Sequence, residues 1–138
     1  MEKSRDEGAP IYQIEEVSLS DIGQELIALA ERLRAAGEQI KGRHLLDEPG
    51  VSYAAADGTP MTQWDVDEEN AQTRSAFRST LKSLRQFRRQ YDRWERLTAE
   101  YALTRMGYSQ RDAAATLGVA ASTINRWAQH PLQVEDYR

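Results

Sequence analysis

Apolar residues follow helical spacing in the first part of the chain. They recur at intervals of three, four or seven residues, at Ile22, Leu26, Ala30, Leu33 and Ile40. Ser18 and Ser20 each offer an N-cap hydroxyl, and Asp21 stands at capping-box spacing from Ser18. This pattern predicts an N-terminal amphipathic helix that ends near Lys41 and Gly42.

A longer helical pattern, without glycine or proline, runs from about Asp67 to Met106. It contains two series at seven-residue intervals, Phe77, Leu84, Tyr91, Thr98 and Thr80, Phe87, Trp94, Tyr101. The two series are offset by three residues and resemble the a and d positions of a coiled coil. They suit packing against the N-terminal helix or against a second copy of the chain, and the pattern does not separate these alternatives. We expect Gly107 to end the helix, with Tyr108 folding back on Leu103.

The segment 45–64, between these helices, has no helical periodicity. Asp47 to Gly50 is a turn signal, and Asp57-Gly58 follows between two short, partly apolar runs. Asp-Gly in that setting is typical of a β-hairpin. A small hairpin and an irregular loop are equally compatible with this segment.

After Gly107 the pattern indicates two short helices separated by a glycine turn. Ser109 is a suitable N-cap for a helix from Gln110 to Leu117, with Asp112 three residues further on. This helix is expected to bury Ala113, Ala114 and Leu117. Gly118 occupies the turn, where a positive φ is cheap only without a Cβ.

The second short helix is predicted to start near Ala120 or Ala121 and to stop before Pro131. Val119 is expected to enter the core just after the turn, and Ile124 and Trp127 share the inner face. At 100° per residue, the opposite face carries four hydrogen-bonding side chains: Ser122, Asn125, Arg126 and Gln129.

The segment 109–129 resembles the helix-turn-helix of bacterial repressors, resolvases and transposases, a homeodomain-like motif. The resemblance rests on Ala114, Gly118, Val119, Ile124 and Trp127, and departs at Ala120, where a capping Ser or Thr is common. Together with the helical patterns that precede it, this resemblance predicts a mainly α fold, in which an N-terminal helix and a long helix lead into a C-terminal tri-helical unit. A small β-hairpin is the one β element that we consider for this fold.

The resemblance also implies that the second short helix enters the major groove of double-stranded DNA. Ser122, Asn125, Arg126 and Gln129 would then contact base edges, since Arg reads guanine and Asn or Gln reads adenine. The expected backbone contacts are Ser109, Gln110, Arg111 and Thr123, with His130 at the margin.

Charge is distributed unevenly along the 138 residues, whose net charge is −4. Residues 1–70 contain 6 Lys and Arg against 16 Asp and Glu, whereas residues 71–138 contain 12 against 6. Six basic residues lie on one face of the long helix: Arg78, Lys82, Arg85, Arg89, Arg93 and Arg96. This stripe is interpreted as a phosphate-contacting surface, chiefly through Arg85, Arg89, Arg93 and Arg96, as a partner for the acidic half, or as a solvated face.

Several functional classes find no support in the sequence. There is no cysteine, the two histidines do not fit a metal-ligand pattern, and no nucleophile–base pair or phosphate-binding glycine loop occurs. The acidic cluster of Asp65, Asp67, Glu68 and Glu69 is explained by a helix N-terminus. We therefore expect no catalysis, no cofactor and no metal. With neither a membrane-spanning run nor a secretory signal, the expected location is cytoplasmic.

These observations divide the chain into an acidic region (1–66) for dimerisation or partner binding, a long basic helix (67–106) and an overlapping helix-turn-helix unit (93–131). The predicted function is sequence-specific binding of double-stranded DNA, as a homodimeric transcriptional regulator. One alternative is an antitoxin or plasmid-partition protein whose acidic half binds a protein partner. Another is the DNA-recognition component of a recombinase or transposase.

Overall fold

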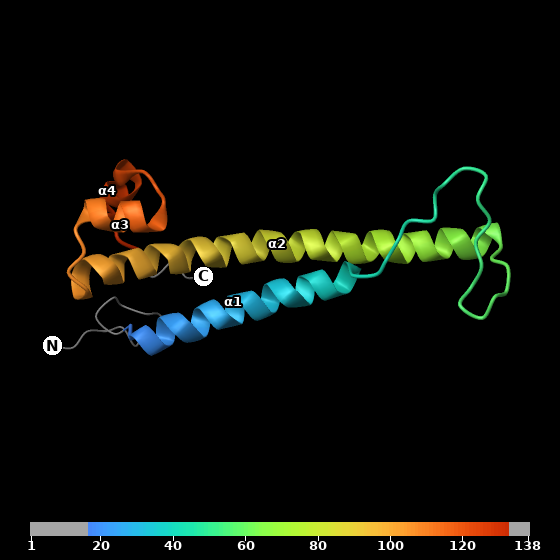
Figure 1. The fold of residues 1–138 in the computed structure, drawn as a ribbon, viewed down its shortest axis with the longest axis horizontal. Helices are drawn as coiled ribbons and strands as arrows, with labels where there is room; N and C mark the ends of the chain where they lie inside the picture. The colour runs from blue at the N-terminus through green and yellow to red at the C-terminus, as the bar shows by residue number, and fades with distance from the viewer. Residues whose placement is uncertain (1–16, 133–138) are drawn as a thin grey trace. The chain divides into compact units, whose positions relative to one another are not determined.

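The computed structural model describes residues 17–132 and is mainly helical, as predicted. Its helices are α1 (Leu19–Ile40), α2 (Gln63–Arg105), α3 (Gln110–Leu117) and α4 (Ala121–Gln129) (Figure 1). Residues 1–16, which belong to the predicted acidic region, and residues 133–138 lie outside this description. None of the helices within 17–132 combines the length and apolar character needed to cross a bilayer.

The start of α1 is the capping box expected from the sequence. The Ser18 N–H donates to Asp21 Oδ2 at 3.0 Å, and the Asp21 N–H donates to Ser18 Oγ at 3.0 Å. Two of the N–H groups that a helix start leaves without intrahelical partners are thereby satisfied. Gly42, with φ of 81°, follows the end of the helix.

The start of α2 lies before the predicted position, at Gln63 instead of Asp67. A second reciprocal cap explains the difference: the Asp65 N–H donates to Thr62 Oγ1 at 3.1 Å, and the Thr62 N–H donates to Asp65 Oδ2 at 3.0 Å. At its other end, Gly107 has φ of 76° and the Tyr108 N–H donates to Ala102 O at 3.0 Å. This is the Schellman-type ending that Gly107 predicts.

The connection between α1 and α2 contains no β-strand within its described residues 41–62, so the small hairpin, one of the two alternatives for this segment, is not confirmed. A tight turn is found at Asp57-Gly58 instead. The Ala55 N–H donates to Thr59 O at 2.8 Å, and Ala54 and Pro60 form a single antiparallel bridge. Gly58 adopts φ of 88°, which the Asp-Gly signal anticipates.

The chain forms two compact units, one of residues 30–87 and one that joins the segments before and after it. In the unit 30–87, the end of α1 runs antiparallel to the first part of α2. Thr80 Oγ1 donates to Ala36 O at 3.1 Å, and further along the Asn70 side chain accepts from the Leu46 N–H at 2.8 Å and donates to Leu46 O at 3.1 Å.

The other unit contains residues 17–29 and 88–132 of the described chain. Its buried apolar residues come from the segment just before α1, from the start of α1, from α2, from α3 and from α4. They are Val17, Ile22, Leu29, Trp94, Leu97, Ala99, Tyr101, Ala113, Ala114 and Ile124. This unit holds every residue of the segment that resembles a helix-turn-helix.

Only one of the two predicted heptad series of α2 is buried. Its members Thr80, Trp94 and Tyr101 are buried and Phe87 is half-buried. The other series is largely exposed, at Phe77, Leu84 and Tyr91, with Thr98 half-buried. The positions that accompany the buried series each lie one residue before a member of the exposed series. They are Ala76, Ser83, Gln90 and Leu97. A 3.6-residue helix drifts about 20° per heptad, so periodicity alone does not select between adjacent residues.

Candidate nucleic-acid interface

Three helices share one small core at the C-terminal end of α2. Ala99 from α2, Ala113 and Ala114 from α3 and Ile124 from α4 are buried together, and Ile124 has 0% exposure. Leu103, Val119 and Trp127 are partly buried and pack against this cluster. Three of its four buried members are alanines, which allow helices to approach closely, and Ile124 is the largest buried side chain of this cluster.

The local sequence sets the ends of α3. Ser109 has extended backbone dihedral angles, and its Oγ accepts from the Asp112 N–H at 3.0 Å. At the other end Gly118 has φ of 76°, and the Gly118 and Val119 N–H groups both donate to Ala114 O, at 2.9 and 3.0 Å. The predicted helix and its glycine turn therefore lie at the expected residues.

One expectation for α3 is wrong. Leu117, predicted to be buried with Ala113 and Ala114, is 36% exposed. It is the last residue of the helix, and the chain then turns at Gly118 so that Val119 packs against the core instead. The turn geometry, more than the helical periodicity, decides which of the two apolar side chains is covered.

The helix α4 divides sharply into an inner and an outer face. Ile124 is buried and Trp127 is half-buried on the inner face. The four predicted base-contacting residues are all exposed on the outer face: Ser122, Asn125, Arg126 and Gln129. Ala120 has N-cap dihedral angles but supplies no side-chain hydrogen bond to the helix, so this start lacks the cap found at Ser109.

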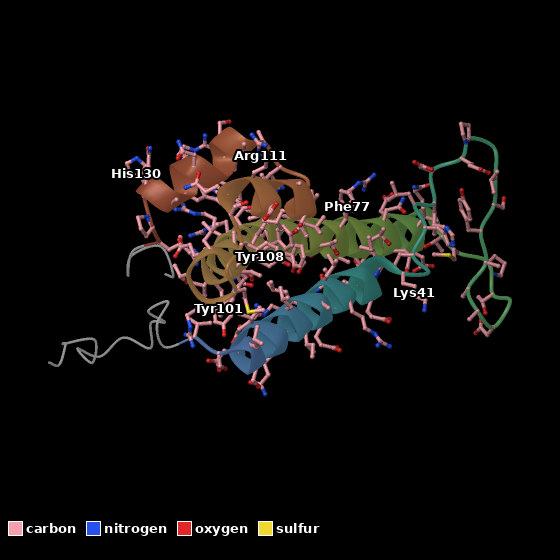
Figure 2. All side chains as sticks on the ribbon, turned by 60° about the vertical axis from the view of Figure 1, so that its left-hand side comes forward. Lys41, Phe77, Tyr101, Tyr108, Arg111 and His130 are labelled. Atoms are coloured by element: carbon pink, nitrogen blue, oxygen red, sulfur yellow. The ribbon has the colours of Figure 1, made fainter. Side chains whose placement is uncertain are left out.

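The predicted backbone-contacting residues surround the start of α3 and the flank of α4. Ser109, Gln110 and Arg111 are exposed, whereas Thr123 is half-buried. Figure 2 shows Arg111 on α3 and His130 at the end of α4. Ser109 Oγ already accepts the capping hydrogen bond, which leaves its hydroxyl hydrogen as the group that an external acceptor can use.

Arg96 has a structural role that the sequence analysis missed. Its guanidinium donates to the backbone carbonyl of His130 and lies over the Trp127 ring, 5.8 Å from the centroid. A cation over an indole face is attracted by the ring quadrupole, so Arg96 ties the end of α4 to α2. Arg93 is also half-buried, whereas Arg85 and Arg89 are exposed. The regular spacing of the basic stripe does not distinguish an arginine that supports α4 from one that is exposed.

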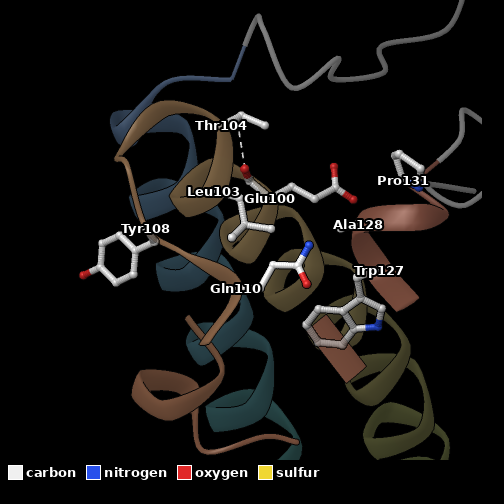
Figure 3. Close-up of a pocket in the computed structure, with 8 residues that line it drawn as sticks. All are labelled: Glu100, Leu103, Thr104, Tyr108, Gln110, Trp127, Ala128 and Pro131. Carbon is white, nitrogen blue, oxygen red and sulfur yellow. Dashed lines mark hydrogen bonds between the residues drawn. The ribbon is translucent and has the colours of Figure 1, made fainter. Parts of the chain in front are cut away.

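A buried carboxylate lies beside this contact. Glu100 is 8% exposed and borders a cavity of about 390 Å³ whose lining includes Leu103, Tyr108 and Trp127 (Figure 3). Its Oε2 accepts from the Leu132 N–H at 3.1 Å. Burial raises the pKa of Glu100, and the hydrogen bond from Leu132 and the nearby positive charge of Arg96 oppose that rise. The sequence signal for this buried carboxylate is an acidic residue within an otherwise apolar run.

The acidic cluster at the start of α2 takes part in local hydrogen bonds. Asp65 caps the helix, and Asp67 Oδ1 accepts from Gln63 Nε2 at 2.9 Å. Within residues 17–132 no group of three or more His, Asp or Glu side chains is arranged to hold a metal ion. The exposed face of α4 offers hydrogen-bonding side chains and the positive charge of Arg126.

Comparison of the chain with protein-family models, with curated proteins and with solved structures finds no match.

Proposed function

We propose that residues 109–129 form a helix-turn-helix that binds double-stranded DNA, and that the protein is a sequence-specific, homodimeric transcriptional regulator without catalytic activity. The observation that carries this proposal is the division of α4. Its inner residue Ile124 is fully buried, while Ser122, Asn125, Arg126 and Gln129 are exposed on the other side. An exposed helix face with several side chains able to form bidentate hydrogen bonds suits the major groove.

The arrangement of the neighbouring helices supports this proposal. In a helix-turn-helix, a preceding helix and two short helices share a core, so that the second short helix is held firmly with its polar face outward. Ala99, Ala114 and Ile124 come from three such helices, and Gly118 makes the turn with φ of 76°. The cation–π contact of Arg96 with Trp127 adds a further attachment for α4.

Each predicted contact residue has a role in the proposed complex. Arg126 recognises guanine O6 and N7, Asn125 and Gln129 recognise adenine N6 and N7, and Ser122 donates to or accepts from a base edge. Ser109, Gln110, Arg111 and Thr123 position the unit on phosphates. Arg85, Arg89 and Arg93 extend the positive charge along α2, while Arg96 serves mainly to support α4.

The homodimer follows from the size of the proposed contact. A single recognition helix reads few base pairs, whereas two helices related by two-fold symmetry read two half-sites about 10 base pairs apart. The proposal therefore predicts a palindromic target and an affinity that falls steeply with salt, since phosphate contacts release condensed counterions.

Selection of bound sites from random duplexes tests the proposal. Wild-type protein is expected to enrich a palindrome, and Arg126→Ala is expected to lose preference at one base pair of each half-site. A lost bidentate contact costs about 1–3 kcal/mol per half-site. The matched control is Arg34→Ala, which removes the same charge from an exposed position of α1 whose guanidinium lies 4.0 Å from Glu38.

The control variant should select the wild-type sequence. Enrichment of no sequence by the wild-type protein would contradict the proposal of specific binding. Equal effects of Arg126→Ala and Arg34→Ala would contradict the assignment of α4 as the recognition helix.

A further inference from the structure

In the unit formed by residues 30–87, small or polar side chains lie between the two helices and large apolar side chains lie outside that contact. The contact between its two helices uses small or polar residues: Ala36 is 3% and Thr80 is 5% exposed, and Ala76 and Ser83 are half-buried. Large apolar side chains lie outside this contact. Phe77 and Leu81 are each 51% exposed, and Leu33 is 42% exposed.

The large side chains gather on one side of the helix pair. At 100° per residue, Phe77, Leu81 and Leu84 lie within an arc of about 60° on α2. Ile40, seven residues after Leu33 on α1, lines the same groove of about 360 Å³ as Phe77 and Leu45. We call this surface the outer apolar face, and it consists of Leu33, Ile40, Leu45, Phe77, Leu81 and Leu84.

We propose that the outer apolar face binds the same face of a second copy of this chain, and that the two helix pairs form an antiparallel four-helix bundle. This inference rests on the homodimer of the proposed function and names the surface that forms it. A two-fold axis brings identical patches together, so one apolar face suffices for both copies. Bundles of this kind bury such faces in their core.

The available area fits this partner. Half-exposed Leu and Phe side chains each leave on the order of 100 Å² accessible, so the face leaves on the order of 500 Å² per chain. The largest apolar patch of a single chain is commonly about 300–600 Å² and is often functional. Two such faces together bury about 1,000 Å², the lower limit for a specific interface, and the polar rim adds to it.

Charge selects the arrangement of the four helices. Arg78, Lys82 and Arg85 are exposed on α2 beyond the apolar strip, so two copies of α2 side by side would place like charges together. The exposed surface of α1 is mixed instead, because Glu31 and Glu38 are accompanied there by Arg32 and Arg34. The α2 helix of one copy therefore packs beside α1 of the other, which runs the two α2 helices in the same direction.

Side-chain size agrees with this arrangement. Ala30 and Gly37 lie beside Leu33 on α1, on the side away from Ala36. A Cβ added at Gly37 would meet nothing within 4 Å, so no contact inside the chain requires glycine there. Glycine inside a helix costs stability relative to alanine. Glycine at position 37 would allow the large side chains of α2 from a second copy to approach α1 closely.

Sedimentation equilibrium of the full chain without DNA, over a wide range of concentration, tests the inference. Wild-type protein is expected to dimerise reversibly. Leu81→Glu is expected to weaken the dimer about 30-fold or more, since it places a charge in the centre of the interface. The control Ile27→Glu changes an equally apolar helix position, 64% exposed and outside the face, and should leave the dimer intact.

Gly37→Gln provides a second variant whose folding is secure, because the site is open and glutamine favours helix. It should retain full helicity by circular dichroism and weaken the dimer about 10-fold. A wild-type monomer at all concentrations, or a dimer unaffected by both Leu81→Glu and Gly37→Gln, would overturn the inference. Duplex binding by Arg126→Ala is measured separately, so a dimer that fails to bind DNA contradicts the proposed function and not this interface.

Discussion

Truncation of Ile124 to alanine is the sharpest test of the small core behind α4. The Ile124 side chain is 0% exposed, and the other buried members of its cluster are all alanines. Removing its three outer carbons costs about 2.4 kcal/mol in transfer free energy, at about 0.8 kcal/mol per carbon. A residual cavity of about 50 Å³ adds about 1 kcal/mol. We therefore expect a loss of about 3–4 kcal/mol in the free energy of unfolding.

Hydrogen exchange monitored by NMR provides a local measurement of this loss. The Ile124 N–H, which donates to Ala120 O, and the Gly118 N–H, which donates to Ala114 O, report on α4 and on the end of α3. Their protection should fall by about two to three orders of magnitude.

Ile27→Ala is the matched control, because the same side chain is 64% exposed there. We expect its free energy of unfolding to change by less than about 0.5 kcal/mol. If the two truncations cost the same, the reasoning that places Ile124 at the centre of the core is refuted.

Four further predictions concern the same unit. Ala120→Ser should raise the free energy of unfolding by about 0.5–1 kcal/mol in urea titration, because Ala120 provides no side-chain cap; a loss would contradict the N-cap geometry. Gly118→Ala should lower it by about 1 kcal/mol through its φ of 76° alone, since an added Cβ meets nothing within 4 Å. Burial raises the pKa of Glu100, so the folded state binds its proton more tightly and stability falls as pH rises above the ordinary value of 4.5; Glu100→Gln should remove this fall in Tm measured from pH 4 to 8, and an unchanged profile would contradict the assignment. Arg89→Ala should reduce the slope of log Kobs against log salt by about 1, whereas an unchanged slope would exclude this position from the DNA interface.

Local features were predictable from the sequence because each depends on a few neighbouring residues. The capping pair of Ser18 and Asp21 and the Ser109 cap involve side chains three residues from their partners. The ends of α2 and α3 at Gly107 and Gly118 follow from the preference of glycine for positive φ. The cap formed by Thr62 and Asp65 is equally local. The periodicity alone does not include this cap and therefore predicts the start of α2 too late.

The exposure of the outer face of α4 was predictable for a related reason. Once Ile124 is assigned to the core, rotation along a single helix places Ser122, Asn125, Arg126 and Gln129 on the other side, and all four are exposed. This assignment depends only on helical geometry, so the candidate base-contacting residues were identifiable without a tertiary structure.

Tertiary structure alone decided which of several equivalent residues is buried. Leu117 and Val119 are both apolar and close to the turn, and the path of the chain after Gly118 determines that Val119 packs inward. Arg96 belongs to a regular basic stripe, yet contact with His130 and Trp127, more than thirty residues away in the chain, distinguishes it from the exposed Arg89.

The sequence by itself therefore determined the helices, the caps at Ser18 and Ser109 and the polar face of α4, because these depend on periodicity and on hydrogen bonds between near neighbours. Only the tertiary structure decided that Thr80, and not Phe77, faces α1, since adjacent heptad positions differ little in periodicity and the packed partner selects between them. That selection leaves Phe77 on the outer apolar face, where we propose that a second copy of the chain binds.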